Sequence, residues 1–515
     1  MSILPKHRNI IPRWRDFRTT LSLGELDSVG TYDDEPDTSD QNLDFLADKV
    51  QDWRNHKTPS FAADLVSSAL VLRREDDARE AATFLLDSDT SASKIAKELA
   101  SKILTPSRQI DQEQDVYPPL SDVQIVDPKE VNRRAGANIR KLRVRLMREP
   151  RNAIAWVDLA REYTLLGFPV KKITRPMEIA LALAPDNRFI LRSAARLYVH
   201  LDEPDRARYI LRRTELTRYD PWLLAAEIGV SSHAGKPSSY IKRGAGLVSD
   251  TDFAPSQTTE LASALATVEV FFGSRSKARK LFRKSLSDPN ENSAAQAEWG
   301  SHQLNNFDVD FIDVNIPRIF EARALDYYHN GQWNDAFKQS VNWYYDQPFS
   351  SLPSALSSYL ACTILEDYRT AAALAKLGLV ANPNDPILWN NLAFSYANIG
   401  DISKAIEALD SIDRSDISND TQTILLATEG LIRYRQGNVN EGRRLYLQAI
   451  ENANGQENRE LRAEASIFLA REEILSNSLS VTAALESANK ESKDVKRKDI
   501  LLLLDRLNKM PLPSS

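Results

Sequence analysis

Side chains able to bind a metal or attack a substrate are few in this chain of 515 residues. None of the histidines pairs with another at the spacing of metal ligands, and there is no cysteine cluster, so the sequence predicts no metal site. The histidines are His7, His56, His200, His233, His302 and His329. The single cysteine, Cys362, excludes an internal disulfide and fits a reducing compartment. Because Cys362 lies on a predicted helix face, we interpret it as a small core residue.

One stretch, residues 229–247, contains the glycines and lysine of a phosphate-binding loop. That motif needs four residues between its glycines and a Ser or Thr after the lysine. Here five residues separate Gly229 from Gly235, Pro237 follows the lysine, and no strand precedes the stretch. We interpret it as an insertion between repeats. No nucleophile elbow or dinucleotide-binding turn appears either, so we predict no catalytic residue, no cofactor and no enzyme activity.

The elements that must position any functional group are helices, and residues 386–409 show this most clearly. Trp389, Leu392 and Tyr396 recur at steps of three and four residues, which is typical of one helix face. Gly400 ends this helix, and Asp401 can cap the next one. One helical hairpin cannot bury its apolar face, so neighbouring hairpins at a fixed period are expected.

The same pattern returns at steps of 34 and 35 residues, at 352–385 and at 317–351, and more loosely around Gly437. An upstream block begins at Trp156. The order of aromatic, Leu-small, Tyr, Gly-Asp and Ala resembles the tetratricopeptide repeat over roughly residues 150–455. This resemblance implies an all-α solenoid of stacked antiparallel helix pairs in a right-handed superhelix. It also implies helical caps and a concave groove that is lined by the first helix of each pair.

We predict five segments along the chain. They are an N-terminal arm, basic then acidic and flexible (1–52), a helical cap with a proline-containing linker (53–128), a basic repeat block (129–310), a second repeat block (311–455), and C-terminal helices with a cap (456–515).

Positive charge is concentrated in residues 133–218, with 20 Lys or Arg against 9 Asp or Glu in a chain of net charge −6. The resemblance places four basic residues of this region in the concave groove, where they would focus potential toward an acidic partner. They are Arg161, Arg192, Arg196 and His200. The alternative interpretation is a solvated or self-paired cluster.

The second block departs from the family's clamp for a terminal carboxylate. Asn391 matches one clamp position, but Leu356, Leu360, Ile424 and Thr428 stand where the clamp needs polar or basic side chains. We therefore expect a mixed apolar and aromatic groove that suits an amphipathic helix or an extended segment. Its predicted partner-binding residues are Tyr328, Leu356, Leu360, Asn390, Phe394, Leu431, Tyr434 and Arg435. Alternatively, some of them pack against the N-terminal arm or a neighbouring helix.

The beginning of the chain, residues 1–23, mixes arginines with Trp14 and Phe17. It is either an arm that packs on the body or frays, or a docking peptide for a partner. The acidic residues that follow could swing against a basic surface elsewhere in the chain.

These patterns favour a non-enzymatic, cytoplasmic scaffold or adaptor that binds a protein partner in its groove. The alternative is a nucleic-acid-binding protein, or a regulatory subunit of a larger complex, acting through residues 133–218. No apolar run is long enough to span a membrane. Self-association through the apolar helix at 495–507 stays open.

Overall fold

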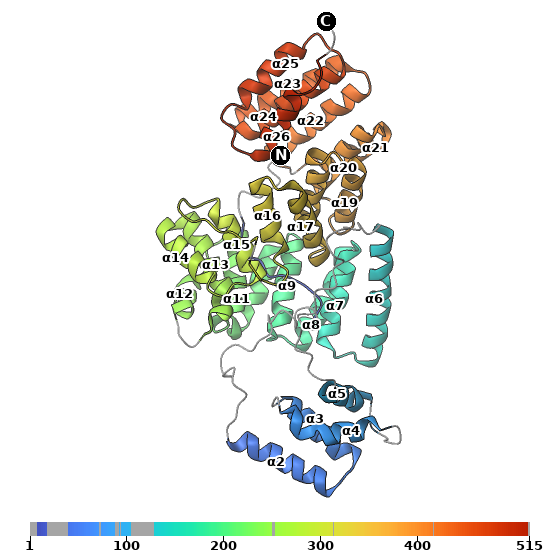
Figure 1. Cartoon of the computed structure of the whole chain (residues 1–515), viewed down its shortest axis with the longest axis vertical. Helices are drawn as coiled ribbons and strands as arrows, with labels where there is room; N and C mark the ends of the chain where they lie inside the picture. Colours follow the sequence, from blue (N-terminus) through green and yellow to red (C-terminus); the bar gives the residue numbers. More distant parts are fainter. Residues whose placement is uncertain are drawn as a thin grey trace. The chain divides into compact units, whose positions relative to one another are not determined.

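The computed structural model describes residues 8–17, 40–71, 74–87, 92, 94–104, 128–249, 253–312, 314–415 and 417–512. These residues form helices and loops, with no strand among them, so the prediction of an all-α chain is confirmed (Figure 1). No helix in the described part is long and apolar enough to cross a membrane. The chain divides into two compact units, Ser28–Asp122 and a larger unit of Met1–Asp27 with Val123–Ser515.

The smaller unit is a cluster of short helices around Trp53, Leu65 and Leu85. Its helices are α2 (Asp40–Asn55), α3 (Pro59–Val71), the 3₁₀ turn η1 (Glu75–Ala78), α4 (Arg79–Leu86) and α5 (Lys94–Leu104). Because α2 begins at Asp40, the last part of the predicted flexible segment is helical. Residues 18–39 and most of the predicted linker lie outside the described residues.

The larger unit is built from successive helical hairpins. Its helices are α6 (Pro128–Arg148), α7 (Ala153–Leu165), α8 (Val170–Leu183), α9 (Arg188–His200), α10 (Pro204–Arg213), η2 (Glu215–Arg218), α11 (Pro221–His233), α12 (Ile241–Ser249), α13 (Pro255–Phe272), α14 (Arg275–Ser285), α15 (Glu291–Ser301), α16 (Phe320–Asn330), α17 (Trp333–Asp346), α18 (Ser351–Tyr359), the π-helical turn η3 (Leu360–Ile364), α19 (Tyr368–Ala381), α20 (Pro386–Ile399), α21 (Ile402–Asp410), α22 (Asn419–Arg435), α23 (Val439–Gly455), α24 (Arg459–Leu475), α25 (Val481–Glu491) and α26 (Lys498–Asn508).

The first helix of each hairpin packs on its own partner and on the first helix of the next hairpin. This stacking runs through α7, α9, α11, α13 and α15, and again through α18, α20, α22 and α24. Helix α19 also contacts α6 and α7, although about 200 residues separate them in the sequence. The predicted boundaries at 310 and 455 fall within the larger unit and do not separate compact bodies.

The hairpin of α20 and α21 shows why the sequence folds this way locally. The Asp385 carboxylate accepts hydrogen bonds from the backbone N–H groups of Ile387 and Leu388, which satisfies the free donors at the start of α20. Gly400 ends the helix with a φ of 92°, a left-handed conformation that glycine adopts without steric cost. Asp401 then caps α21. The hairpin predicted for residues 386–409 is therefore confirmed.

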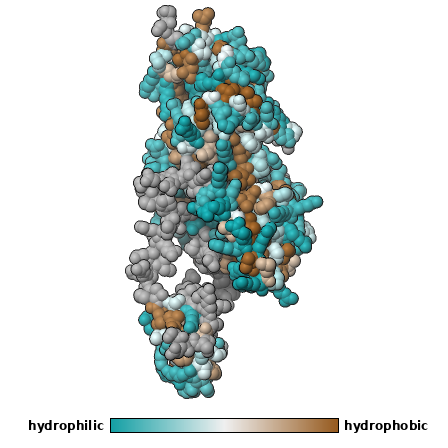
Figure 2. Space-filling view, turned by 90° about the vertical axis from the view of Figure 1, so that its right-hand side faces the viewer, coloured by the Kyte–Doolittle hydropathy of each residue, from teal (hydrophilic) through white to brown (hydrophobic). Residues whose placement is uncertain are grey.

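Two glycines permit the close approach of α22 and α23. A methyl group on Gly430 would lie 2.8 Å from a ring carbon of Tyr446, and one on Gly442 would lie 2.5 Å from a ring carbon of Tyr434. The tyrosine rings therefore explain why glycine stands at both positions. The face drawn in Figure 2 is mostly hydrophilic, with hydrophobic side chains in small groups, as expected when the hairpins bury their apolar sides against one another.

Candidate functional site

One binding surface of the larger unit is already occupied by residues 8–17 of the same chain, which we call the docked segment. Its backbone is non-helical up to Asp16. Asn292 and Gln296 of α15 donate side-chain hydrogen bonds to the carbonyl oxygens of Ile11 and Arg8, both at 3.1 Å. On α11, a methyl group at Gly229 would lie 2.0 Å from the Ile10 carbonyl oxygen. Gly229, the first glycine of the stretch that only partly matches a phosphate-binding loop, therefore makes room for the docked segment.

Arginines of the docked segment meet buried carboxylates. Arg15, 2% exposed, donates to both oxygens of Asp346 at the end of α17 and to Glu291 at the start of α15. Arg8 and Arg13 both pair with Glu321 of α16. Burial acts to raise the pKa of Asp346, but the Arg15 guanidinium outweighs it, so that the pKa lies below its ordinary value.

Aromatic side chains complete the contact. Trp14 is fully buried with its ring 5.5 Å from that of Phe349, and the Phe17 ring lies 5.2 Å from that of Phe189 on α9. The interpretation of the chain's beginning as an arm that packs on the body is confirmed for residues 8–17.

The prediction that four basic residues line an open groove is wrong, because their side chains are paired or packed inside the larger unit. Arg161 pairs with the adjacent Glu162, and Arg192 makes two hydrogen bonds to Glu260, at 2.9 and 3.2 Å. The Arg196 guanidinium lies 5.0 Å from the centre of the Phe349 ring, and His200 packs on the same ring at 5.9 Å. Their neighbours include the carboxylates that hold the docked segment, so this interior does not offer an acidic partner a free basic surface.

Burial shifts the pKa of two of these groups. It lowers the pKa of Arg196 to about 10, with Arg13 adding repulsion, while Glu321 acts in the opposite direction. It lowers the pKa of His200 to about 4, with Arg196 as the second cause. His200 is therefore neutral at pH 7 beside the docked segment.

Most of the predicted partner-binding residues are also packed between helices. Leu356, Leu360, Asn390 and Leu431 are completely buried, so they cannot form the exposed lining of a groove. Asn390 accepts a hydrogen bond of 2.7 Å from the Thr428 hydroxyl of the next first helix. For these four residues, the prediction of an exposed position is wrong, because their side chains join one first helix to its neighbours.

The polar members of the predicted set have partners within the chain. The Tyr328 hydroxyl donates to Asp499 at 2.6 Å, which ties α16 to α26. The Tyr434 hydroxyl donates to Glu473 at 2.6 Å. Arg435, about one quarter exposed, pairs with Glu472 at 2.7 Å.

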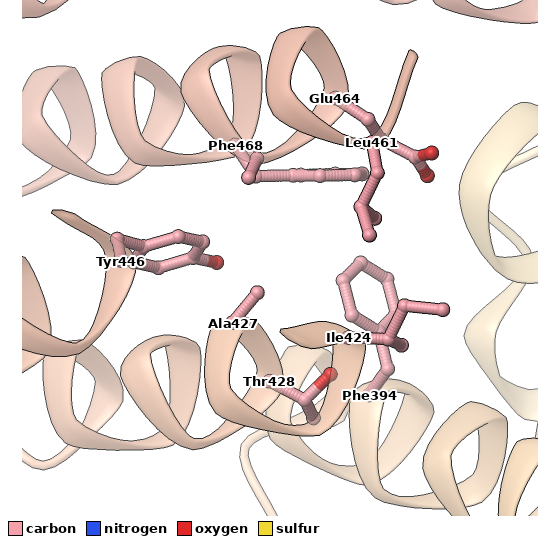
Figure 3. Close-up of a pocket in the computed structure, with 9 residues that line it drawn as sticks. Phe394, Ile424, Ala427, Thr428, Tyr446, Leu461, Glu464 and Phe468 are labelled. Carbon is pink, nitrogen blue, oxygen red and sulfur yellow. The ribbon is translucent and has the colours of Figure 1, made fainter. Parts of the chain in front are cut away.

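Phe394 is the predicted residue that borders open space. It lines a small hollow between α20, α22 and α24, with a cavity volume of about 30 Å³ (Figure 3). The planes of the Phe394 and Phe468 rings meet at 71°, with 5.5 Å between the ring centres. The other lining residues are Ile424, Ala427, Thr428, Tyr446, Leu461, Glu464 and Ala465. The hollow is thus mainly apolar, with one carboxylate and one threonine hydroxyl in its wall.

Helix α6 carries exposed positive charge, as the excess of Lys and Arg in residues 133–218 led us to expect. Some of its arginines pair locally, as Arg133 and Arg134 do with Glu130. Arg140, Lys141 and Arg148 are exposed along the same helix.

The structure brings together three residues that sequence spacing did not connect. His302, the cap residue of α15, and His329 of α16 both contact the Glu298 carboxylate, at 3.1 and 3.0 Å. These two histidines do not stand at metal-ligand spacing in the sequence, but the fold brings them to the same carboxylate. Glu298 and His302 stand four residues apart, a visible signal, whereas His329 is 27 residues further along the chain.

No family model and no curated protein matches the chain. Among solved structures, the chain is similar to the APC/C hetero-tetramer Cut9–Hcn1, with 13% identity, 91% of this chain and 93% of that chain covered, and a TM-score of 0.42. It is also similar to human IFIT1, a dimer with PPP-AAAA (14%, 93% and 96%, TM-score 0.32), and to yeast Tom70 (13%, 92% and 96%, TM-score 0.29). At these identities the similarity concerns the fold alone. The succession of helical hairpins seen in the described residues is the fold that the tetratricopeptide-repeat resemblance implied.

Proposed function

We propose that this protein is a non-enzymatic scaffold or adaptor that holds a segment of a partner protein against its first helices. The observation that carries this proposal is the docked segment. Amide side chains of α15 bind carbonyl groups of its non-helical backbone, and its Trp14 side chain is fully buried. Hydrogen bonds to the main chain and pockets for side chains are the means by which an extended peptide is bound.

The proposed partner site is the hollow bordered by Phe394, Leu461 and Phe468. Its proposed ligand is one apolar anchor side chain from an amphipathic helix or an extended segment, since buried anchors supply most of the binding energy in such contacts. The exposed part of Arg435 is the proposed polar contact on the same helix as Ile424 and Thr428. Asn390 supports this surface from behind, because it accepts a hydrogen bond from Thr428 in the wall of the hollow.

Site-specific photocrosslinking in cells tests the proposal. A photoreactive phenylalanine analogue at Ala427, in the wall of the hollow, should form a discrete, nuclease-resistant adduct with a protein. The same analogue at Leu447, exposed on the outer helix α23, is the matched control and should not form that adduct.

Phe468→Ala, combined with the crosslinker at Ala427, should abolish the adduct while the circular dichroism of the chain stays unchanged. An adduct of equal yield in the Phe468 variant, or the same adduct from position 447, would show that the hollow is not the partner site.

The exposed bases of α6 favour a second candidate function, which is binding of nucleic acid or of an acidic partner in a larger complex. An interaction with phosphates weakens steeply as salt rises, because bound counterions are released. Arg140→Ala with Lys141→Ala should then lower the affinity for a nucleic-acid duplex and flatten its salt dependence. Equal binding by the variant and the unmodified chain at every salt concentration would remove this candidate. A cytoplasmic location stays a prediction.

A further inference from the structure

We propose that Glu298, His302 and His329 form a binding site for a divalent ion of the zinc class, which joins α15 to α16. The side chains offer one carboxylate oxygen and two imidazole nitrogens, and these three atoms lie within 4.8 Å of one another. Two imidazoles with one carboxylate are a ligand set for Zn²⁺ and for the neighbouring ions Co²⁺ and Ni²⁺. This inference is independent of the proposed scaffold function.

The distances are close to those that coordination requires. Glu298 Oε1 lies 3.1 Å from His302 Nε2 and 3.0 Å from His329 Nδ1. Ligands at normal zinc distances in a tetrahedral site stand roughly 3.4 Å apart. Each carboxylate–imidazole distance would therefore need to lengthen by only a few tenths of an ångström, and the three ligand atoms already lie within 4.8 Å of one another.

The environment of Glu298 differs from that of the buried carboxylates that are paired with arginine. Its side chain is only 3% exposed, yet the ion pairs that the described residues form with it come from His302 and His329, and none comes from lysine or arginine. Buried Asp346 and Glu260, in contrast, are each paired with arginine. A buried carboxylate needs a positive partner, and a cation held by two imidazoles would supply one.

The site has an accessible side. The side chains of His302 and His329 are 44% and 30% exposed, and their ring centres are 3.8 Å apart. Three protein ligands with an open direction match a zinc site whose fourth position is taken by water. Nearby Asp326 is not needed as a ligand, because its oxygens already accept hydrogen bonds from the Phe311 N–H and the Asn330 amide.

The site has a structural consequence. Residues 302–319 between α15 and α16 contain no helix among those described, so the ion would bridge the two helices at the point where the succession of hairpins is interrupted. An ion that binds the folded chain must also stabilise it, by an amount that grows with the free ion concentration.

The test is a titration of the full, untagged chain with ZnCl₂ after removal of metals, followed by competition with a chromophoric chelator. We expect one strong site per chain and a rise in Tm on adding zinc. With CoCl₂ in place of zinc, a visible absorption spectrum typical of nitrogen and oxygen ligands should appear.

Two substitutions separate ion binding from a mere hydrogen-bond network. His329→Asn and His302→Gln each keep an amide donor near the lost ring nitrogen, so Glu298 retains a hydrogen-bond partner while a ligand is removed. Either should weaken zinc binding by more than the about 10–100-fold that is typical when a residue behind a ligand is lost. His233→Asn, on α11 and outside the cluster, is the control and should bind zinc normally.

Two results would overturn the proposal. One is that the unmodified chain binds no stoichiometric zinc. The other is that zinc affinity and the zinc-induced rise in Tm are the same in the His302 and His329 variants as in the His233 control.

Discussion

The guanidinium group of Arg15 and the carboxylate of Asp346 form a two-pronged pair across 331 positions of the sequence. Nε donates to Oδ1 at 2.8 Å and Nη2 donates to Oδ2 at 2.6 Å. This planar geometry fixes direction as well as distance, which a lysine could not do. The pair therefore determines where the docked segment lies against α17.

Replacing Arg15 should release the docked segment. Arg15→Ala leaves the buried carboxylates of Asp346 and Glu291 without their main cation, and breaking such a pair typically costs about 3–5 kcal/mol. Hydrogen exchange of the peptide containing residues 8–17 should become fast, and the chain should unfold at lower denaturant. Arg140→Ala on exposed α6 is the control, with an expected effect within about 0.5 kcal/mol. Unchanged protection of the segment in Arg15→Ala would contradict its anchoring role.

The approach of α22 to α23 can be tested by adding a single methyl group. Gly430→Ala should destabilise the chain by about 1–3 kcal/mol, because the new Cβ would overlap the Tyr446 ring. Gly455→Ala, near the end of α23, meets no atom within 4 Å and should be neutral or slightly stabilising, as helix propensity alone predicts. Urea denaturation of both variants distinguishes crowding from propensity, and equal effects would argue against the crowding.

Asp158 should make the stability of the larger unit fall as the pH rises. Burial raises its pKa to about 7, and the neighbouring carboxylates of Asp16 and Glu162 act in the same direction, against Arg161 and the Phe17 N–H. Since the unfolded carboxyl ionises near pH 4, its stabilising contribution is complete below pH 4 and is lost as the pH approaches 7. Asp158→Asn should therefore be more stable than the unmodified chain at pH 8, by roughly 2–4 kcal/mol, and similar to it at pH 4. Denaturation curves at both pH values, with Asp288→Asn as an exposed control, would measure the difference.

His200 should make the stability of the larger unit fall as the pH falls. Its pKa is lowered to about 4 by burial and by Arg196, whereas the unfolded side chain titrates near 6.5. Its contribution is complete above pH 6.5 and is lost as the pH falls to about 4, up to roughly 3 kcal/mol. His200→Gln should reduce this loss of stability between pH 6.5 and 4. His56→Gln in the smaller unit is the control, and equal pH profiles for His200→Gln and the unmodified chain would disprove the prediction.

The helical hairpins could be predicted from the sequence, because the residues that signal them lie close together in the chain. Trp389, Leu392, Gly400 and Asp401 lie within 13 positions, and each reports a helix face, a turn or a cap. The same signals could not separate two kinds of inner position. Leu431 and Phe394 both follow the apolar period of a first helix, yet one is sealed between helices and the other borders the hollow.

Contacts between residues far apart in the chain could not be predicted from the sequence. Nothing in the spacing of Arg15 pointed to Asp346, or of His302 to His329, because these pairs depend on how successive hairpins stack in three dimensions. The excess of positive charge at 133–218 was real, but the sequence could not show that Arg192 is neutralised by Glu260.

The docked segment also sets an order of events during synthesis. Arg15 leaves the ribosome well before Glu291, Glu321 and Asp346 exist, and at 5–20 residues per second the wait for Asp346 is roughly 15–65 s. Throughout that interval the surface that binds Trp14 and its neighbours is incomplete. The early hairpins must therefore form before the docked segment can bind completely. During this period a chaperone can hold the first residues of the nascent chain.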